Sequence, residues 1–246
     1  MCGRSYGVVA RNDPWIWPPA MNISEKAKYD CVQNVILAHA SVVNLARRKY
    51  ADKNFKFGLP LIIEYGIPFE ANNPNDVTFA DRTTTSQSDW VWGPLVTGDY
   101  PAYLRTLDGS PSYNYFNGTD LPTFTDSQKA SIKGTLDFLA INYYSASYRS
   151  ASGKRVPSLP TAGATWQNLY PQGLRAITKL LHGYYNNLEI MISECGTAVP
   201  NEMNMTIQQR VNDTVRLYFH CLANLFLVSN QLFQWNHSIT FRCYSY

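Results

Sequence analysis

The chain has 246 residues, of which 45% are hydrophobic, and this is enough for one domain with a sizeable core. Its 21 basic and 18 acidic residues leave a net charge of +3 without a basic block that could follow a phosphate backbone, so no nucleic-acid partner is expected. No uninterrupted apolar run approaches membrane-spanning length, and no membrane partner is expected either.

Cysteines and glycosylation motifs bear on the cellular compartment. The five cysteines form no CxxC pair, so we expect no metal site and no cofactor, and their odd number leaves at least one unpaired within the chain: Cys2, Cys31, Cys195, Cys221 and Cys243. Five Asn-X-Ser/Thr sequons predict a secretory or extracellular protein: Asn22, Asn117, Asn204, Asn212 and Asn236. The N-terminus predicts no signal peptide, because Arg4 and Arg11 interrupt its weak apolar stretch.

The first half of the chain predicts a helix, a strand and a second helix. Residues 29–50 have apolar side chains at helical spacing and a basic last turn, which suits the helix dipole. "FKFGLPLII" (55–63) reads as a buried strand and is followed by a polar stretch over 70–76. Residues 79–91 are predicted to be helical. "GPLVTGDYPAYLRTL" leads from a loop into a short helix, and residues 108–124 read as a loop.

The second half continues the alternation. Residues 126–134 start a helix, with Thr125 as cap and Gln128 three residues later, and lead into the strand "TLDFLAINYYS". After a long loop to residue 164 come an amphipathic helix, "GLRAITKLLHGYY", a third strand, "EIMIS", and a helix over 205–226. This order of helices and strands predicts right-handed parallel crossovers and an α/β architecture.

Polar side chains gather where two of these strands end. Asn142, Tyr143 and Tyr144 end one strand, and Ser193 and Glu194 end the next. Reacting groups of parallel α/β sheets lie at this edge, and a carboxylate facing an Asn and a Tyr is the arrangement expected for a glycosidase nucleophile. The alternative is a solvated carboxylate at the mouth of a loop.

Five separated stretches resemble glycoside hydrolase family 1, the retaining β-glucosidases, β-galactosidases and myrosinases built on a (β/α)8 barrel. They are "NVILAHA", "GPLVTGDYP", "DFLAINYYS", "TWQNLYPQGLRAI" and "IMISECG", and they occur in the family's order. The resemblance covers roughly residues 25–220 and leaves 227–246 as a divergent C-terminal tail. It implies that residues 1–246 form a single α/β domain, a partial TIM barrel with the strands between the acid/base strand and the nucleophile strand.

The resemblance also implies site residues and a ligand. Glu194 falls on the nucleophile of the I-T-E-N-G motif, Tyr144 on the Tyr that orients it, and Asn142 on a substrate-binding Asn. Trp166 matches an aromatic expected to pack. The ligand implied is a β-glycoside or sugar, and the family implies secretion. Three further matches are expected to be structural: Arg175, Asp213 and Arg216.

Departures from the family pattern are as informative as the matches. Cys195 replaces the motif's Asn and Ser193 its Thr, while the T-F-N-E-P acid/base motif and the sugar-binding W-S-L-x-D-N-x-E-W motif do not occur. A retaining glycosidase needs two carboxyls about 5 to 5.5 Å apart. Glu64 is the other carboxylate at a strand end, but the family places its acid on a different strand.

Three hypotheses therefore remain for this sequence. The first is a family 1 β-glycosidase truncated at both ends and inactive as a single chain. The second is a nonenzymatic carbohydrate-binding module that uses Tyr144, Trp166 and loop aromatics. The third is a structural fragment that pairs with a complementary half-barrel or forms a homo-oligomer, since an open sheet exposes unpaired edges.

Overall fold

A computed structural model describes residues 25–109, 116–161, 163–164, 166–217 and 219. Of these described residues, those up to 59 together with those in 86–138 form one compact unit, and those in 60–85 together with those from 139 to 219 form a second. The predicted C-terminal tail over 227–246 lies outside the described residues, as do Cys2, Cys221, Cys243, Asn22 and Asn236. The single domain over residues 1–246 stays a prediction.

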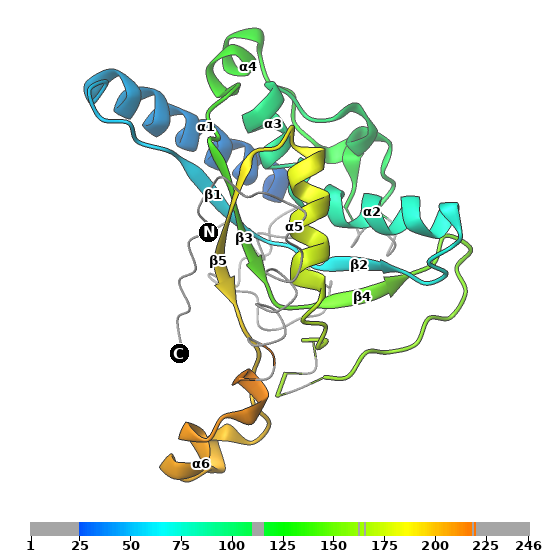
Figure 1. Cartoon of the computed structure of the whole chain (residues 1–246). Helices are drawn as coiled ribbons and strands as arrows, with labels where there is room; N and C mark the ends of the chain where they lie inside the picture. Colours follow the sequence, from blue (N-terminus) through cyan, green and yellow to red (C-terminus); the bar gives the residue numbers. More distant parts are fainter. Residues whose placement is uncertain (1–24, 110–115, 162, 165, 218, 220–246) are drawn as a thin grey trace. The chain divides into compact units, whose positions relative to one another are not determined.

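The first unit is helical, and its longest element is α1 (Glu25–Lys49), which contacts the short helices α3 and α4 (Figure 1). Apolar residues three or four positions apart line its buried face, so one stripe of the helix is removed from water: Tyr29, Val32, Ile36, Ala40 and Val43. This confirms the helix predicted from the spacing over 29–50.

Two short helices follow in the same unit. α3 (Trp92–Thr97) lies where a loop was predicted, because Pro94 is tolerated in its first turn and Gly98, at φ 98°, ends it. The 3-10 helices η1 (Ala102–Thr106) and η3 (Gly118–Asp120) come next. α4 (Asp126–Ile132) starts with the predicted capping box.

The second unit is built on a sheet with the strand order β1-β3-β5 (Figure 1). The strands are β1 (Gly58–Ile62), β3 (Phe138–Tyr143) and β5 (Glu189–Cys195). Beyond the end of β1, the Ile63 N–H donates to Asn142 O (3.1 Å) and the Tyr65 N–H to Ser145 O (3.2 Å), so both segments run in the same direction. The three predicted strands are therefore neighbours, with β3 in the centre.

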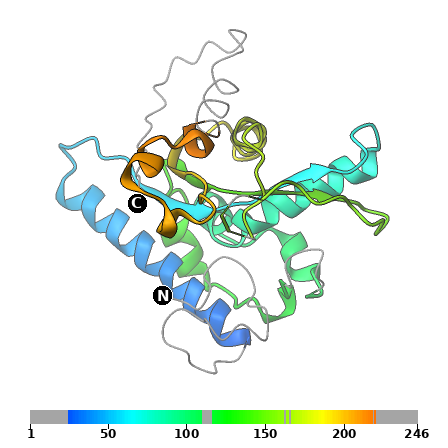
Figure 2. The ribbon, with the colours of Figure 1, turned by 90° about the horizontal axis from the view of Figure 1, so that it is seen from below.

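A second parallel ladder joins β2 (Tyr65–Pro68) to β4 (Ala146–Arg149). Neither strand was predicted, because four residues are too few to show a period. The helix α2 (Pro74–Asp89) lies along β2 (Figure 2), where Thr84 Oγ1 accepts the Gly66 N–H at 2.9 Å. α2 starts earlier than predicted, since the polar residues before Phe79 form its first turn and the Asn73 side chain accepts the Asn75 N–H.

The last elements follow the predicted order with one correction. α5 (Gly173–Tyr184) contacts β2 and β5, and its buried side chains share one face. α6 (Ile207–Val211) starts with a capping box and ends at Asn212, and the chain is helical again from Thr214. The continuous helix predicted over 205–226 is therefore wrong, and residues from 220 onward lie outside the description.

Candidate active site

The strand ends bring Glu194 and Tyr144 together. Glu194 is the penultimate residue of β5, and Tyr144 directly follows the neighbouring strand β3. The Tyr144 hydroxyl donates a hydrogen bond to Glu194 Oε2, and both side chains are half-buried. The structure thus gives the predicted carboxylate a phenol donor from the adjacent strand, while part of its surface stays accessible.

Asn142 is tied to the strand that carries Glu194. Its side chain is buried, and Ser193 Oγ donates to Asn142 Oδ1 at 2.6 Å. The amide oxygen is thereby used inside the protein. The contact joins β3 to β5 one residue before Glu194, where Ser193 stands in place of the family's Thr. A substrate-binding role for Asn142 stays a prediction.

Trp166 is an exposed aromatic beside this pair. Its ring meets that of Tyr144 edge to face, with centroids 6.2 Å apart and planes at 80°. The residue is 64% exposed, which does not fit the packing role expected for it. It presents a large apolar surface next to the phenol that holds Glu194.

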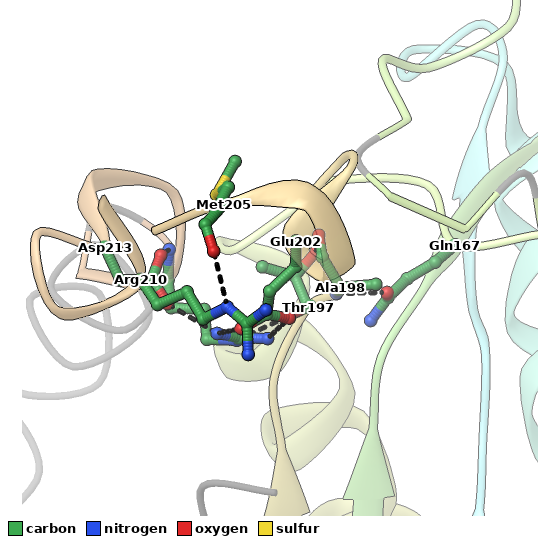
Figure 3. A network of polar contacts seen from close by, with 8 residues as sticks. Gln167, Thr197, Ala198, Glu202, Met205, Arg210 and Asp213 are labelled. Carbon is green, nitrogen blue, oxygen red and sulfur yellow. Dashed lines mark hydrogen bonds and ion pairs between the residues drawn. The ribbon is translucent and has the colours of Figure 1, made fainter. Parts of the chain in front are cut away.

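The loop after Trp166 is anchored to both strands. Ser145 Oγ, just beyond β3, accepts the Asn168 N–H at 3.1 Å. Gln167 is only 2% exposed; its Nε2 donates to Gly196 O at 2.6 Å, and its Oε1 accepts the Ala198 N–H at 2.8 Å. Figure 3 shows this side chain reaching the backbone at Ala198. Gln167 lies in a loop without periodic signal, so sequence reasoning missed it.

A charged network holds the same segment beyond β5. Arg216 donates to both carboxylate oxygens of Glu202 (2.8 and 2.6 Å), to Asp213 (2.7 Å) and, through Nε, to Thr197 O (3.1 Å). The bonds to the two carboxylates, first of all that to Glu202 and then that to Asp213, raise the pKa of Arg216, and the bond from Arg216 lowers the pKa of Glu202. Arg216 and Asp213 thus have the structural pairing that the sequence predicted.

Two other polar residues at the strand ends have partners outside the pair of Glu194 and Tyr144. Tyr143 is fully buried and donates to Tyr170 O at 2.6 Å, and its burial raises the pKa of the phenol. Glu64 Oε2 lies 3.6 Å from Nη2 of Arg149 on β4. Among these polar residues at the ends of the described strands, the candidate site consists of Glu194, Tyr144, Asn142 and Ser193.

The described residues provide neither a cluster of metal ligands nor a membrane span. That part of the chain contains no group of three or more His, Cys, Asp or Glu that could hold a metal ion. None of its helices is long and apolar enough to cross a bilayer.

Comparison with known proteins decides the family. Residues 14–227 match the sequence model described as Glycosyl hydrolase family 1. The chain belongs to this family. Among curated relatives, Beta-glucosidase 24 of Oryza sativa subsp. japonica is 31% identical over 233 residues, which are 86% of this chain and 44% of that protein. Ipecoside beta-D-glucosidase of Carapichea ipecacuanha is 29% identical, over 78% of this chain and 38% of its own length.

Solved structures of family 1 proteins have the same fold. A rice β-glucosidase variant, described in a covalent complex with glucose, is 26% identical, with a TM-score of 0.70 over 82% of this chain and 45% of its own. β-Glucosidase 2 of the fungus Trichoderma reesei, in complex with Tris, has a TM-score of 0.70 at 23% identity over 84% of this chain. The chain spans about 45% of the rice structure, and its described strands form no closed barrel, which confirms the partial barrel.

Proposed function

We propose that this family 1 chain carries the nucleophile side of a retaining β-glycosidase site. In this proposal Glu194 attacks the anomeric carbon of a β-glucoside or a related sugar and forms a glycosyl-enzyme bond as the glycosidic C–O bond breaks. The observation that carries the proposal is the hydrogen bond from Tyr144 to Glu194 at the ends of neighbouring strands. The rice relative's covalent complex with glucose supports the same chemistry.

The contacts of Glu194 suit an attacking carboxylate. A hydroxyl that donates to Oε2 fixes the orientation of the carboxylate, and Oε1 then serves for attack. The bond between Ser193 and Asn142 holds the preceding residue against the central strand. We propose that the Asn142 amide N–H and the exposed ring of Trp166 contact the sugar or its aglycone.

Proton donation is where this chain differs from a complete glycosidase. When the C–O bond breaks, an alkoxide leaving group must take a proton from a general acid. Glu64, the other carboxylate at a strand end, is already engaged in an ion pair with Arg149 on β4. We therefore propose that the chain by itself hydrolyses natural β-glucosides little or not at all, and that a complementary half-barrel would have to supply the acid.

Two substrates with different leaving groups test this proposal. An activated aryl β-glucoside, such as the 2,4-dinitrophenyl glucoside, needs no acid for the first step, whereas methyl β-glucoside does. We expect covalent glycosylation by the first and no turnover of the second, with Glu194→Gln abolishing the reaction and Glu64→Gln leaving it unchanged. Rapid hydrolysis of methyl β-glucoside that is lost in Glu194→Gln would show that a second carboxylate acts in this chain.

A carbohydrate-binding module is the second candidate, favoured by one observation. Trp166 is 64% exposed beside Tyr144, and aromatic faces of this kind stack on sugar rings. Titration of the Glu194→Gln chain with cellobiose, followed by tryptophan fluorescence, separates the two candidates. Saturable binding that is lost when Trp166→Ala is added, together with no labelling of the wild-type chain by an activated glucoside, would favour binding without catalysis.

A further inference from the structure

We infer that Gln167 is a positioning residue for Glu194, an inference that rests on the function proposed above. The contacts form a closed circuit. Glu194 is held by Tyr144, the ring of Tyr144 meets that of Trp166, and the next residue, Gln167, binds the backbone two to four residues beyond Glu194. The loop that carries the exposed tryptophan thus holds the end of the nucleophile strand.

The Gln167 amide takes the place of a strand residue beyond the end of β5. β5 ends at Cys195, yet the next segment donates the Ala198 N–H to Gln167 and accepts a hydrogen bond at Gly196 O. In a parallel ladder, a residue on one strand faces a residue on the other. Its N–H donates to the C=O of the residue before that partner, and its C=O accepts the N–H of the residue after it. The side-chain amide of Gln167 makes this pattern around Thr197 and so extends the pairing of β5 by one position.

Burial makes this contact specific. Gln167 is 2% exposed and both ends of its amide are bonded, whereas a buried amide without partners is strongly unfavourable. Thr197, between the two bonded residues, is 6% exposed, and its carbonyl accepts from Arg216. The segment 196–198 is therefore held by Arg216 and by the Trp166 loop, from which Gln167 makes two hydrogen bonds and the Gly163 N–H donates a third to Ala198 O (3.0 Å).

The inference predicts what removing the amide does. Gln167→Met keeps the length of the side chain but makes neither hydrogen bond, so the segment 196–198 opens more often and the Glu194 carboxylate leaves the geometry fixed by Tyr144. We expect amide hydrogen exchange of a peptide covering 195–201 to be roughly ten- to hundredfold faster, as for the loss of two hydrogen bonds. Gln208→Met, at an exposed position of α6, is the matched control and should leave exchange unchanged.

A carboxyl substitution adds a pH-dependent rescue. Protonated Glu has the same donor and acceptor pattern as Gln, and burial raises the pKa of a carboxyl. Gln167→Glu should therefore exchange like wild type at pH 5 and faster than wild type at pH 8, where the ionised carboxylate still accepts the Ala198 N–H but no longer donates to Gly196 O. A purely steric role of Gln167 would give the same ratio to wild type at both pH values.

A labelling experiment tests whether the Gln167 hydrogen bonds affect the proposed attack by Glu194. The reagent is 2,4-dinitrophenyl 2-deoxy-2-fluoro-β-glucoside, and labelling of Glu194 is read by peptide mass. We expect labelling about tenfold slower in Gln167→Met than in wild type and unchanged in Gln208→Met. Wild-type exchange in Gln167→Met would overturn the inference, and so would faster exchange with wild-type labelling. If even wild type takes up no label, the proposed function fails, and the exchange measurements alone decide whether Gln167 holds the segment.

Discussion

The Tyr144 hydroxyl donates to the Glu194 carboxylate across 50 positions of sequence. The contact joins the end of the central strand β3 to the end of its neighbour β5. A hydrogen bond from a hydroxyl to a carboxylate is stronger than one between neutral groups, so a change at Tyr144 should alter the position of the Glu194 carboxylate.

Removing the phenol should slow the attack by Glu194. Hydrogen bonds to charged groups contribute about 1.5–3 kcal/mol, so Tyr144→Phe should lower the rate of covalent glycosylation by about 10- to 100-fold. The rate is measured by intact mass with the activated fluoroglucoside. Tyr148→Phe, which removes a phenol on β4, is the control and should react like wild type.

Gly173 should be intolerant of any side chain. A Cβ there would meet the Tyr143 hydroxyl at 2.1 Å, and this hydroxyl is fixed by its bond to Tyr170 O. Gly173→Ala should therefore lower the free energy of unfolding by about 1–3 kcal/mol. Gly183→Ala on the same helix has no atom within 4 Å of the new Cβ and should gain about 0.5–1 kcal/mol. Urea unfolding of both variants measures this difference, and equal effects would contradict the packing.

The network around Arg216 should weaken in acid. The pKa of Glu202 is lowered from its ordinary value of 4.5, chiefly by the bond from Arg216. A lowered pKa in the folded state means that the contribution to stability is complete above pH 4.5 and is lost as the pH falls through the folded pKa. Thermal unfolding between pH 7 and pH 3 should thus decline more steeply in wild type than in Glu202→Gln. Parallel profiles would show that the ion pair is not coupled to folding.

Two sequons should carry glycans when the chain is made in a secretory cell. Asn204 and Asn212 are exposed and lie where η4 (Glu202–Asn204) and α6 end. The Asn117 side chain, by contrast, is bonded to Thr119 and Asp120. We expect a peptide N-glycosidase to convert Asn204 and Asn212 to Asp, as read by peptide mass. Glycan at Asn117 alone would contradict this expectation.

Local patterns made much of the fold predictable. The capping box of Thr125 and Gln128 depends on residues three positions apart, and the long helix over 29–50 on the spacing of its apolar residues. β2 and β4 have no such signal, because their pairing joins residues about 80 positions apart in sequence, such as Tyr65 and Ala146. Pro94 and Gly98 were read as loop residues, although Pro94 lies in the first turn of α3 and Gly98 ends this helix. Proline and glycine are common both in loops and at helix ends, so the local sequence does not separate the two.

The candidate site was predictable only in part. Glu194 and Tyr144 could be paired because parallel strands place their ends together, and the family resemblance named their roles. The exposure of Trp166 and the buried contact of Gln167 depend on how an irregular loop crosses two strand ends. No period or motif in the sequence encodes that path.

The strand order has a consequence for how the site comes apart. Among the described strands, β3 has a neighbour on each side, whereas β5 pairs only with β3. Edge strands open at lower free energy than central ones, so native-state fluctuations should release Glu194 while Tyr144 is still held. The proposed nucleophile then belongs to the first cooperative unit to unfold, and mild denaturant should abolish covalent labelling of Glu194 before the sheet is lost.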